Sequence, residues 1–151
     1  MYRPAAFDVA DRDELFDLIE LAAFGHLVTM GPSGFDATGL PFLVDRRAGP
    51  AGRLRGHVAR ANTQWREIDG VAALVLFPIT DGYVSPSSYP SKAEHGKVVP
   101  TWNYEVVHVH GTVQIHDDPE WLRELVTDLT DQHEAARSVE SPWVVTDAPG
   151  D

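Results

Sequence analysis

The longest β-strand candidate in this chain is Tyr104 to Ile115, which reads YEVVHVHGTVQI. Because successive residues of a strand point to opposite faces, the stretch divides into two sets. One predicted face carries Glu105, Val107, Val109, Gly111, Val113 and Ile115, and the other carries Tyr104, Val106, His108, His110, Thr112 and Gln114. The pattern predicts one long strand with a mainly apolar face and a face that carries histidines.

Shorter strand candidates precede it. Residues 72–77 (AALVLF) form a continuous apolar run, which predicts a strand that is buried on both faces. Residues 26–30 and 35–44 predict a hairpin around the turn sequence GPSG, and Pro41 predicts a sheet edge or a bulge because it lacks an N–H donor. Further strands are predicted over 53–58 and from Gly82 to Ser85, with a loop over 86–100.

Helices are predicted near both ends of the chain. Asp11 and Glu14 form a capping box that predicts a helix near 12–23, ended by Gly25. Asp118 followed by Pro119 begins a second helix over 119–136, and Ser141 to Asp151 shows no pattern. Between them, Asn62 can cap a short helix through Trp65 and Ile68. About six strands with short connections favour a small antiparallel barrel, mainly β with flanking helices.

The length of 151 residues suits one domain, and 43% hydrophobic and 23% charged residues are typical of a folded protein. Without cysteine the chain has no disulfides, thiolate nucleophile or iron–sulfur cluster. It also lacks an apolar run long enough for a membrane span and an apolar signal core, so we expect a cytoplasmic protein with no membrane partner.

The balance of 12 Lys and Arg against 23 Asp and Glu gives a formal charge of −11, which opposes binding to nucleic acid phosphates. Arginine is moderately grouped at Arg46, Arg47, Arg53, Arg55, Arg60 and Arg66. These side chains are either ordinary solvated charges or donors for a small phosphorylated ligand, and the first interpretation is favoured for most of them.

Three histidines, His108, His110 and His116, are each separated by an even number of positions, so an extended segment would place them on the same face. A metal site is one interpretation of this pattern, but no carboxylate ligand has a diagnostic spacing. Structural or exposed imidazoles are the favoured interpretation, and no metal is predicted. The serines of the loop 86–100 are not in a nucleophile elbow.

Two local clusters suit a ligand. At the junction 57–62, helix N–H groups together with His57, Arg60 and Asn62 can hold an anion, although a simple N-cap by Asn62 explains the pattern equally well. At 100–104 (PTWNY), two aromatic rings and nearby polar groups can flank a flat heterocycle, although aromatic core packing is the commoner explanation.

The chain resembles the PaiB-type family, the FMN-binding negative transcriptional regulators. Three motifs in the order of that family carry the resemblance: GHVARANTQW at 56–65, YVSPS at 83–87 and VPTWNY at 99–104, the last followed by His108 and Gly111. The segments MYRP at 1–4, FGHLVT at 24–29 and LPFL at 40–43 match as well. The resemblance therefore runs along essentially the whole chain.

This resemblance implies an FMN-binding split barrel related to pyridoxamine phosphate oxidase, with FMN at the interface of a homodimer. It assigns the flavin ring to the strand that contains Thr38, Leu40 and Pro41, and the phosphate to the junction after residue 56. The implied phosphate-side residues are His57, Arg60, Ala61 and Asn62, and the implied ring contacts at the start of the long strand are Thr101 and Asn103.

The chain also departs from the family pattern. Thr63 replaces a frequent proline and Ser88 replaces a frequent tryptophan. We expect residues 1–151 to form a single domain that lacks the family's C-terminal segment and its Lys-x-Ser-Gln-Asn motif. The resemblance implies an indirect transcriptional regulator. An FMN-dependent oxidoreductase acting with NAD(P)H or a small molecule, and an interaction module without cofactor, are the alternatives.

The charge pattern predicts that this chain does not bind DNA tightly. The predicted helix over 119–136 offers only Arg123 against five acidic residues, so it lacks the basic face that insertion into a groove requires. We expect binding to random duplex DNA that is weaker than micromolar at physiological salt, as measured by fluorescence anisotropy. A submicromolar affinity with a steep salt dependence would contradict this expectation.

Overall fold

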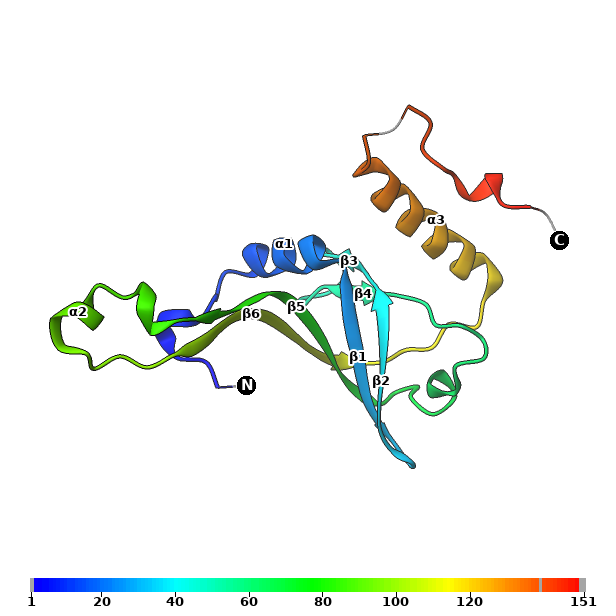
Figure 1. The fold of residues 1–151 in the computed structure, drawn as a ribbon. Coiled ribbons are helices and arrows are strands. Elements are labelled where there is room, and N and C mark those ends of the chain that lie inside the picture. Colours follow the sequence, from blue (N-terminus) through cyan, green and yellow to red (C-terminus); the bar gives the residue numbers. More distant parts are fainter. Residues whose placement is uncertain (1, 139, 150–151) are drawn as a thin grey trace.

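The computed structural model describes residues 2–138 and 140–149, which form two antiparallel sheets with helices around them (Figure 1). The larger sheet has the order β2-β1-β5-β6, and the smaller pairs β3 with β4. The strands are β1 Phe24–Gly31, β2 Gly34–Pro41, β3 Leu43–Asp45, β4 Arg53–Arg55, β5 Ala72–Val84 and β6 Thr101–Thr112. The predicted hairpin is confirmed, and β2, which ends at Pro41, lies at the sheet edge.

One face of the larger sheet forms the core. Val75 and Phe77 of β5 and Val107 of β6 are buried there with Phe16 and Phe42. The alternate β5 residues, Leu74 and Leu76, are only half-buried and lie outside this cluster. The prediction that the strand 72–77 is buried on both faces is therefore wrong within a single chain, because no second layer covers Leu74 and Leu76 there.

The first helix, α1, spans Arg12–Ala22 and packs Phe16 and Ile19 on the core face of the sheet (Figure 1). Asp11 caps it as predicted, accepting from the N–H groups of Asp13 and Glu14. The helix ends before Gly25, because Ala23 takes a positive φ of 56° and turns the chain into β1.

Gly25 has a different role from the predicted helix stop. It lies inside β1, where an added Cβ would come within 2.7 Å of the Phe77 ring. The glycine therefore permits close packing of Phe77 on β1.

The strands Ala72–Phe77 and Gly82–Ser85 were expected to be separate but form the single strand β5. The chain does not turn at Asp81-Gly82, because β6 continues to pair with β5 on both sides of a bulge between Pro78 and Thr80. The paired ends of β5 and β6 extend beyond α1 as a two-stranded arm (Figure 1).

Short helices occupy segments for which none was predicted. The arm ends in η3 Pro86–Ser88 and α2 Ser91–His95, within the expected loop. Two further single turns are η1 Ala5–Phe7 and η4 Val145–Asp147. The helix expected after Asn62 is only the 3₁₀ turn η2 Thr63–Arg66.

The last long helix, α3, spans Pro119–Ala135 with Asp118 as its cap, in agreement with the prediction. Its buried residues Leu125 and Leu129 pack with Leu43 of β3. Arg55 of β4 donates to Asp128 of α3 at 2.9 Å. These contacts attach α3 to the small sheet, at the end of the molecule opposite α2 (Figure 1).

The predicted class, an antiparallel split barrel that is mainly β with flanking helices, is confirmed. In the part of the chain that the structure describes, no helix combines the length and the apolar character needed to cross a membrane.

We expect Gly25→Ala to lower the free energy of unfolding by about 1–3 kcal/mol, because the new methyl group would overpack the core against Phe77. Gly111→Ala in β6 is the matched control, since an added Cβ there meets no atom within 4 Å. Urea denaturation measures both. Equal stability of the two variants would show that Gly25 does not limit core packing.

Candidate functional site

The first group of site residues lies in the loop between β4 and η2. The N–H of Asn62 donates to the carbonyl oxygen of Ala59 at 2.9 Å, which closes a turn with Arg60 and Ala61 at its centre. In such a turn the two central N–H groups take no part in the closing hydrogen bond. They can donate to an anion, in place of the helix N–H groups that the sequence suggested.

Asn62 joins this turn to the edge strand β2. Its side chain accepts from the N–H of Gln64 at 2.9 Å, which confirms the predicted cap, and it donates to the Thr38 hydroxyl at 2.9 Å. The Thr38 hydroxyl donates in turn to the Gln64 side-chain oxygen at 2.6 Å. The buried Gln64 then donates to Thr29 of β1 at 2.9 Å. This network fixes the turn against the sheet.

Arg60 is the charged group of the turn, and its side chain is 69% exposed. It donates to Asp117 at 2.6 Å, and its guanidinium carbon lies 5.3 Å from the centre of the Trp65 ring. This hydrogen bond raises the pKa of Arg60 and holds the pKa of Asp117 below its usual range, so both groups stay charged at neutral pH. An exposed ion pair is weak, and a phosphate can therefore displace Asp117.

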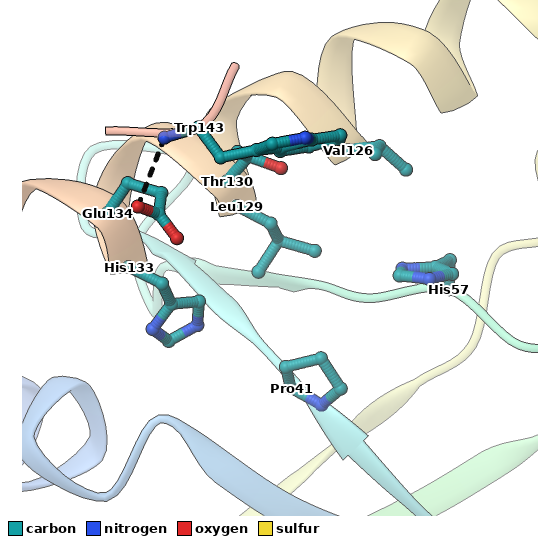
Figure 2. Close-up of a pocket in the computed structure, with 8 residues that line it drawn as sticks. All are labelled: Pro41, His57, Val126, Leu129, Thr130, His133, Glu134 and Trp143. Atoms are coloured by element: carbon teal, nitrogen blue, oxygen red, sulfur yellow. Dashed lines mark hydrogen bonds between the residues drawn. The ribbon is translucent and has the colours of Figure 1, made fainter. Parts of the chain in front are cut away.

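His57 and Pro41 lie on one side of a pocket of about 290 Å³ (Figure 2). The opposite side comes from α3 and the segment after it, with Trp143 at the rim and Leu129 inside. The N–H of Trp143 donates to the Glu134 carboxylate at 3.2 Å, which holds the segment against the helix. Binding pockets for small molecules usually measure roughly 300–1,000 Å³, so this one suits only part of a ligand as large as FMN.

The β2 residues of the predicted site differ in what they can offer. Thr38 is half-buried in the hydrogen-bond network, and Pro41 lines the pocket. The Leu40 side chain is buried in the core, so only its backbone is available to a ligand.

Thr101 and Asn103 are exposed at the start of β6, on the arm. Asn103 lines a shallow pocket of about 400 Å³ together with Tyr83 and Tyr104. Trp102 and Tyr104 are 58% and 63% exposed, which excludes the core-packing interpretation of this aromatic cluster. Trp102 packs against the ring of Tyr83, with 6.2 Å between ring centres, and donates to Asp81 at 2.8 Å.

The structure therefore separates the predicted site residues into two groups. His57, Arg60, Ala61 and Asn62 lie beside β2, at the end of the molecule near α3. Thr101 and Asn103 lie on the arm near α2, at the opposite end (Figure 1). One chain does not bring the two groups together.

The three histidines take two different environments. His108 and His110 of β6 pair with Leu76 and Leu74 of β5, on the face away from the core. His116 stacks on Trp121 with 4.5 Å between ring centres. Among residues 2–138 and 140–149, no three histidine or acidic side chains lie close enough to share a metal ion.

Three residues at the site were not found from the sequence. Gln64 lies within the motif at 56–65, but its bonds to Thr29 and Thr38 depend on the approach of strands distant in sequence. Asp117 and Trp143 likewise meet the loop through the packing of α3 and its flanking segments. No local pattern marks such partners.

The family described as "Putative FMN-binding domain" matches residues 1–151. A Saccharomyces cerevisiae protein described as uncharacterized is 38% identical over 106 residues, which cover 69% of this chain and 63% of the yeast protein. Protease synthase and sporulation protein PAI 2 of Bacillus subtilis is 31% identical over 144 residues, which cover 95% of this chain and 66% of that protein. The chain thus spans less than two thirds of the length of these two relatives.

A solved structure, that of the flavocytochrome Anf3 from Azotobacter vinelandii, matches the fold with a TM-score of 0.58. The match covers 88% of this chain and 58% of that protein, at 18% sequence identity. At 18% sequence identity, this match shows a shared fold and nothing about function.

Proposed function

The chain belongs to the family of FMN-binding domains, with FMN as its cofactor, and we propose that the phosphate of FMN binds at the turn Ala59–Asn62. One observation carries this proposal: the two central N–H groups of the turn, of Arg60 and Ala61, take no part in its closing hydrogen bond, and the same turn carries the exposed Arg60 guanidinium. Charged donors and backbone N–H groups together suit a dianionic phosphate. His57 adds a donor at the adjacent pocket.

In this proposal the edge strand β2 supports the flavin ring. Thr38 and Asn62 hold the turn and the strand together, so the phosphate and the ring have a fixed relation to each other. Leu40 contributes its backbone and Pro41 the wall of the pocket. Bound FMN supplies hydride and electron-transfer chemistry, and the protein supplies binding and orientation.

We further propose that the protein is a homodimer in which Thr101 and Asn103 of a second copy complete the flavin site. The separation of the two groups of site residues supports this, because both groups include exposed residues and the two lie at opposite ends of a single chain (Figure 1). The arm projects away from its own core, as a segment that reaches a partner must (Figure 1).

The biological role that we propose is indirect regulation of transcription in the cytoplasm. The support is the likeness to the Bacillus subtilis protein whose name refers to protease synthesis and sporulation. The formal charge of −11 favours an effect exerted through flavin state or a partner protein over direct DNA contact.

We expect Arg60→Ala to weaken FMN binding by about 1.5–3 kcal/mol, the usual contribution of a charged hydrogen bond. Arg66→Ala is the matched control, since Arg66 also lies near the Trp65 ring, at 5.6 Å, but outside the turn. Asp117→Asn should strengthen binding because it removes the carboxylate that competes for Arg60. Calorimetric titration with FMN measures all three. Equal affinities of the Arg60 and Arg66 variants would remove Arg60 from the site.

A further inference from the structure

The larger sheet has an uncovered side opposite the core, which we call the open face. Pairing across the strands places its residues in rows: Gly39, His26, Leu76 and His108 form one row, and Ala37, Val28, Leu74 and His110 form the next. Phe24 and Met30 of β1 continue the face in both directions, and Phe35 pairs with Met30. The side chains of Phe24, Met30 and Phe35 are 49%, 56% and 76% exposed.

Among the described residues of its strands, the open face carries no Lys, Arg, Asp or Glu side chain, although the chain carries a formal charge of −11. Across β1, β2 and residues 72–78 and 106–112, the sequence contains no Lys, Arg or Glu and one Asp, Asp36. Asp36 pairs with Thr29, which is buried on the core face, so it lies on the other side of the sheet. Surfaces of soluble proteins are rarely so free of charge over four strands, and such patches mark interaction sites.

We propose that a second copy of the chain docks on the open face, and that His26, His108 and His110 make this association stronger at neutral than at mildly acidic pH. The proposal rests on the homodimer proposed above and names its surface and its control by pH. A second copy is the occupant that the charges favour. Two strongly acidic chains can approach without opposing carboxylates only through a surface that lacks them, and a two-fold axis places this face against itself.

The neighbours of the three histidines explain the direction of the pH effect. The residues that pair with them are Gly39 of β2 and Leu74 and Leu76 of β5, none of which carries a charge. His26 meets the Phe24 ring edge-on, with 5.7 Å between ring centres. Burial already lowers the pKa of His108 in the single chain, and the positive charge of the N-terminal amino group, followed by His110, adds to the effect. No carboxylate on this face compensates an imidazolium.

Docking would remove water from these imidazoles, which disfavours their charged form. The dimer therefore binds fewer protons than the separate chains, and it loses stability as pH falls through the ordinary histidine pKa of about 6.5. Each histidine that must be neutral weakens association up to about tenfold per pH unit below that value.

Overall charge predicts the opposite trend. As pH falls toward the pI of about 4.9, the net negative charge shrinks and general repulsion between copies weakens. The direction of the pH dependence therefore separates the open face from non-specific association.

The test is sedimentation velocity on the full chain with FMN at pH 7.5, 6.5 and 5.5, where folding is checked by circular dichroism. We expect a dimer whose Kd rises at least tenfold between pH 7.5 and 5.5. A dimer with a constant or falling Kd would overturn the inference and leave the homodimer standing. A monomer at every pH would overturn both this inference and the proposed homodimer. Flavin absorbance that co-sediments with that monomer would show that FMN binding does not require a dimer.

Variants locate the effect on the open face. Replacing His26, His108 and His110 together by Gln should flatten the pH dependence, whereas His116→Gln, outside the face, should retain it. Leu76→Glu should dissociate the dimer at pH 7.5, and the matched control Leu21→Glu, at an exposed position of α1, should not. If the triple variant keeps the wild-type pH dependence, or if both Glu variants stay dimeric, the open face is not the interface.

Discussion

The pairing of β5 with β6 determines both the core and the arrangement of the candidate site. Near β1 the two strands supply Phe77 and Val107 to the core, and beyond the bulge at Pro78 they continue as the arm. The same pairing therefore holds the folded body together and carries Thr101 and Asn103 away from it. The predicted site residues lie in two separate groups because the paired strands β5 and β6 extend beyond the folded core (Figure 1).

The proposed phosphate end of the site depends on a small polar network. Gln64 is buried, and its amide reaches Thr29 and Thr38, whereas Asn62 connects the turn to Thr38. Buried polar groups are costly unless they are hydrogen-bonded, so the network has one favourable geometry. That geometry holds in place the turn that carries Arg60. The proposed FMN site therefore depends on the fixed position of one loop.

Local patterns in the sequence identified the elements with strong caps and clear alternation. Asp11 and Asp118 mark the starts of α1 and α3, and the alternation along Tyr104–Thr112 identified the two faces of β6. The predicted break in β5 was wrong because Asp81-Gly82 resembles a turn locally, while pairing with β6 keeps the chain extended. Likewise, the family resemblance made Leu40 a candidate flavin contact. Its side chain instead points into the core, which follows from the register between β1 and β2. The separation of Arg60 from Asn103 depends on topology, which local patterns do not encode.

The central claim is that two copies share each flavin site, and mixing two damaged chains tests it most directly. Arg60→Glu removes the phosphate end, and Asn103→Ala removes the contact from the arm. A heterodimer purified through two different tags contains one intact site and one site that lacks both groups. At an FMN concentration that saturates the wild type but neither variant homodimer, flavin absorbance should show one FMN per heterodimer. A heterodimer that holds no more FMN than the two homodimers would contradict a site shared between copies.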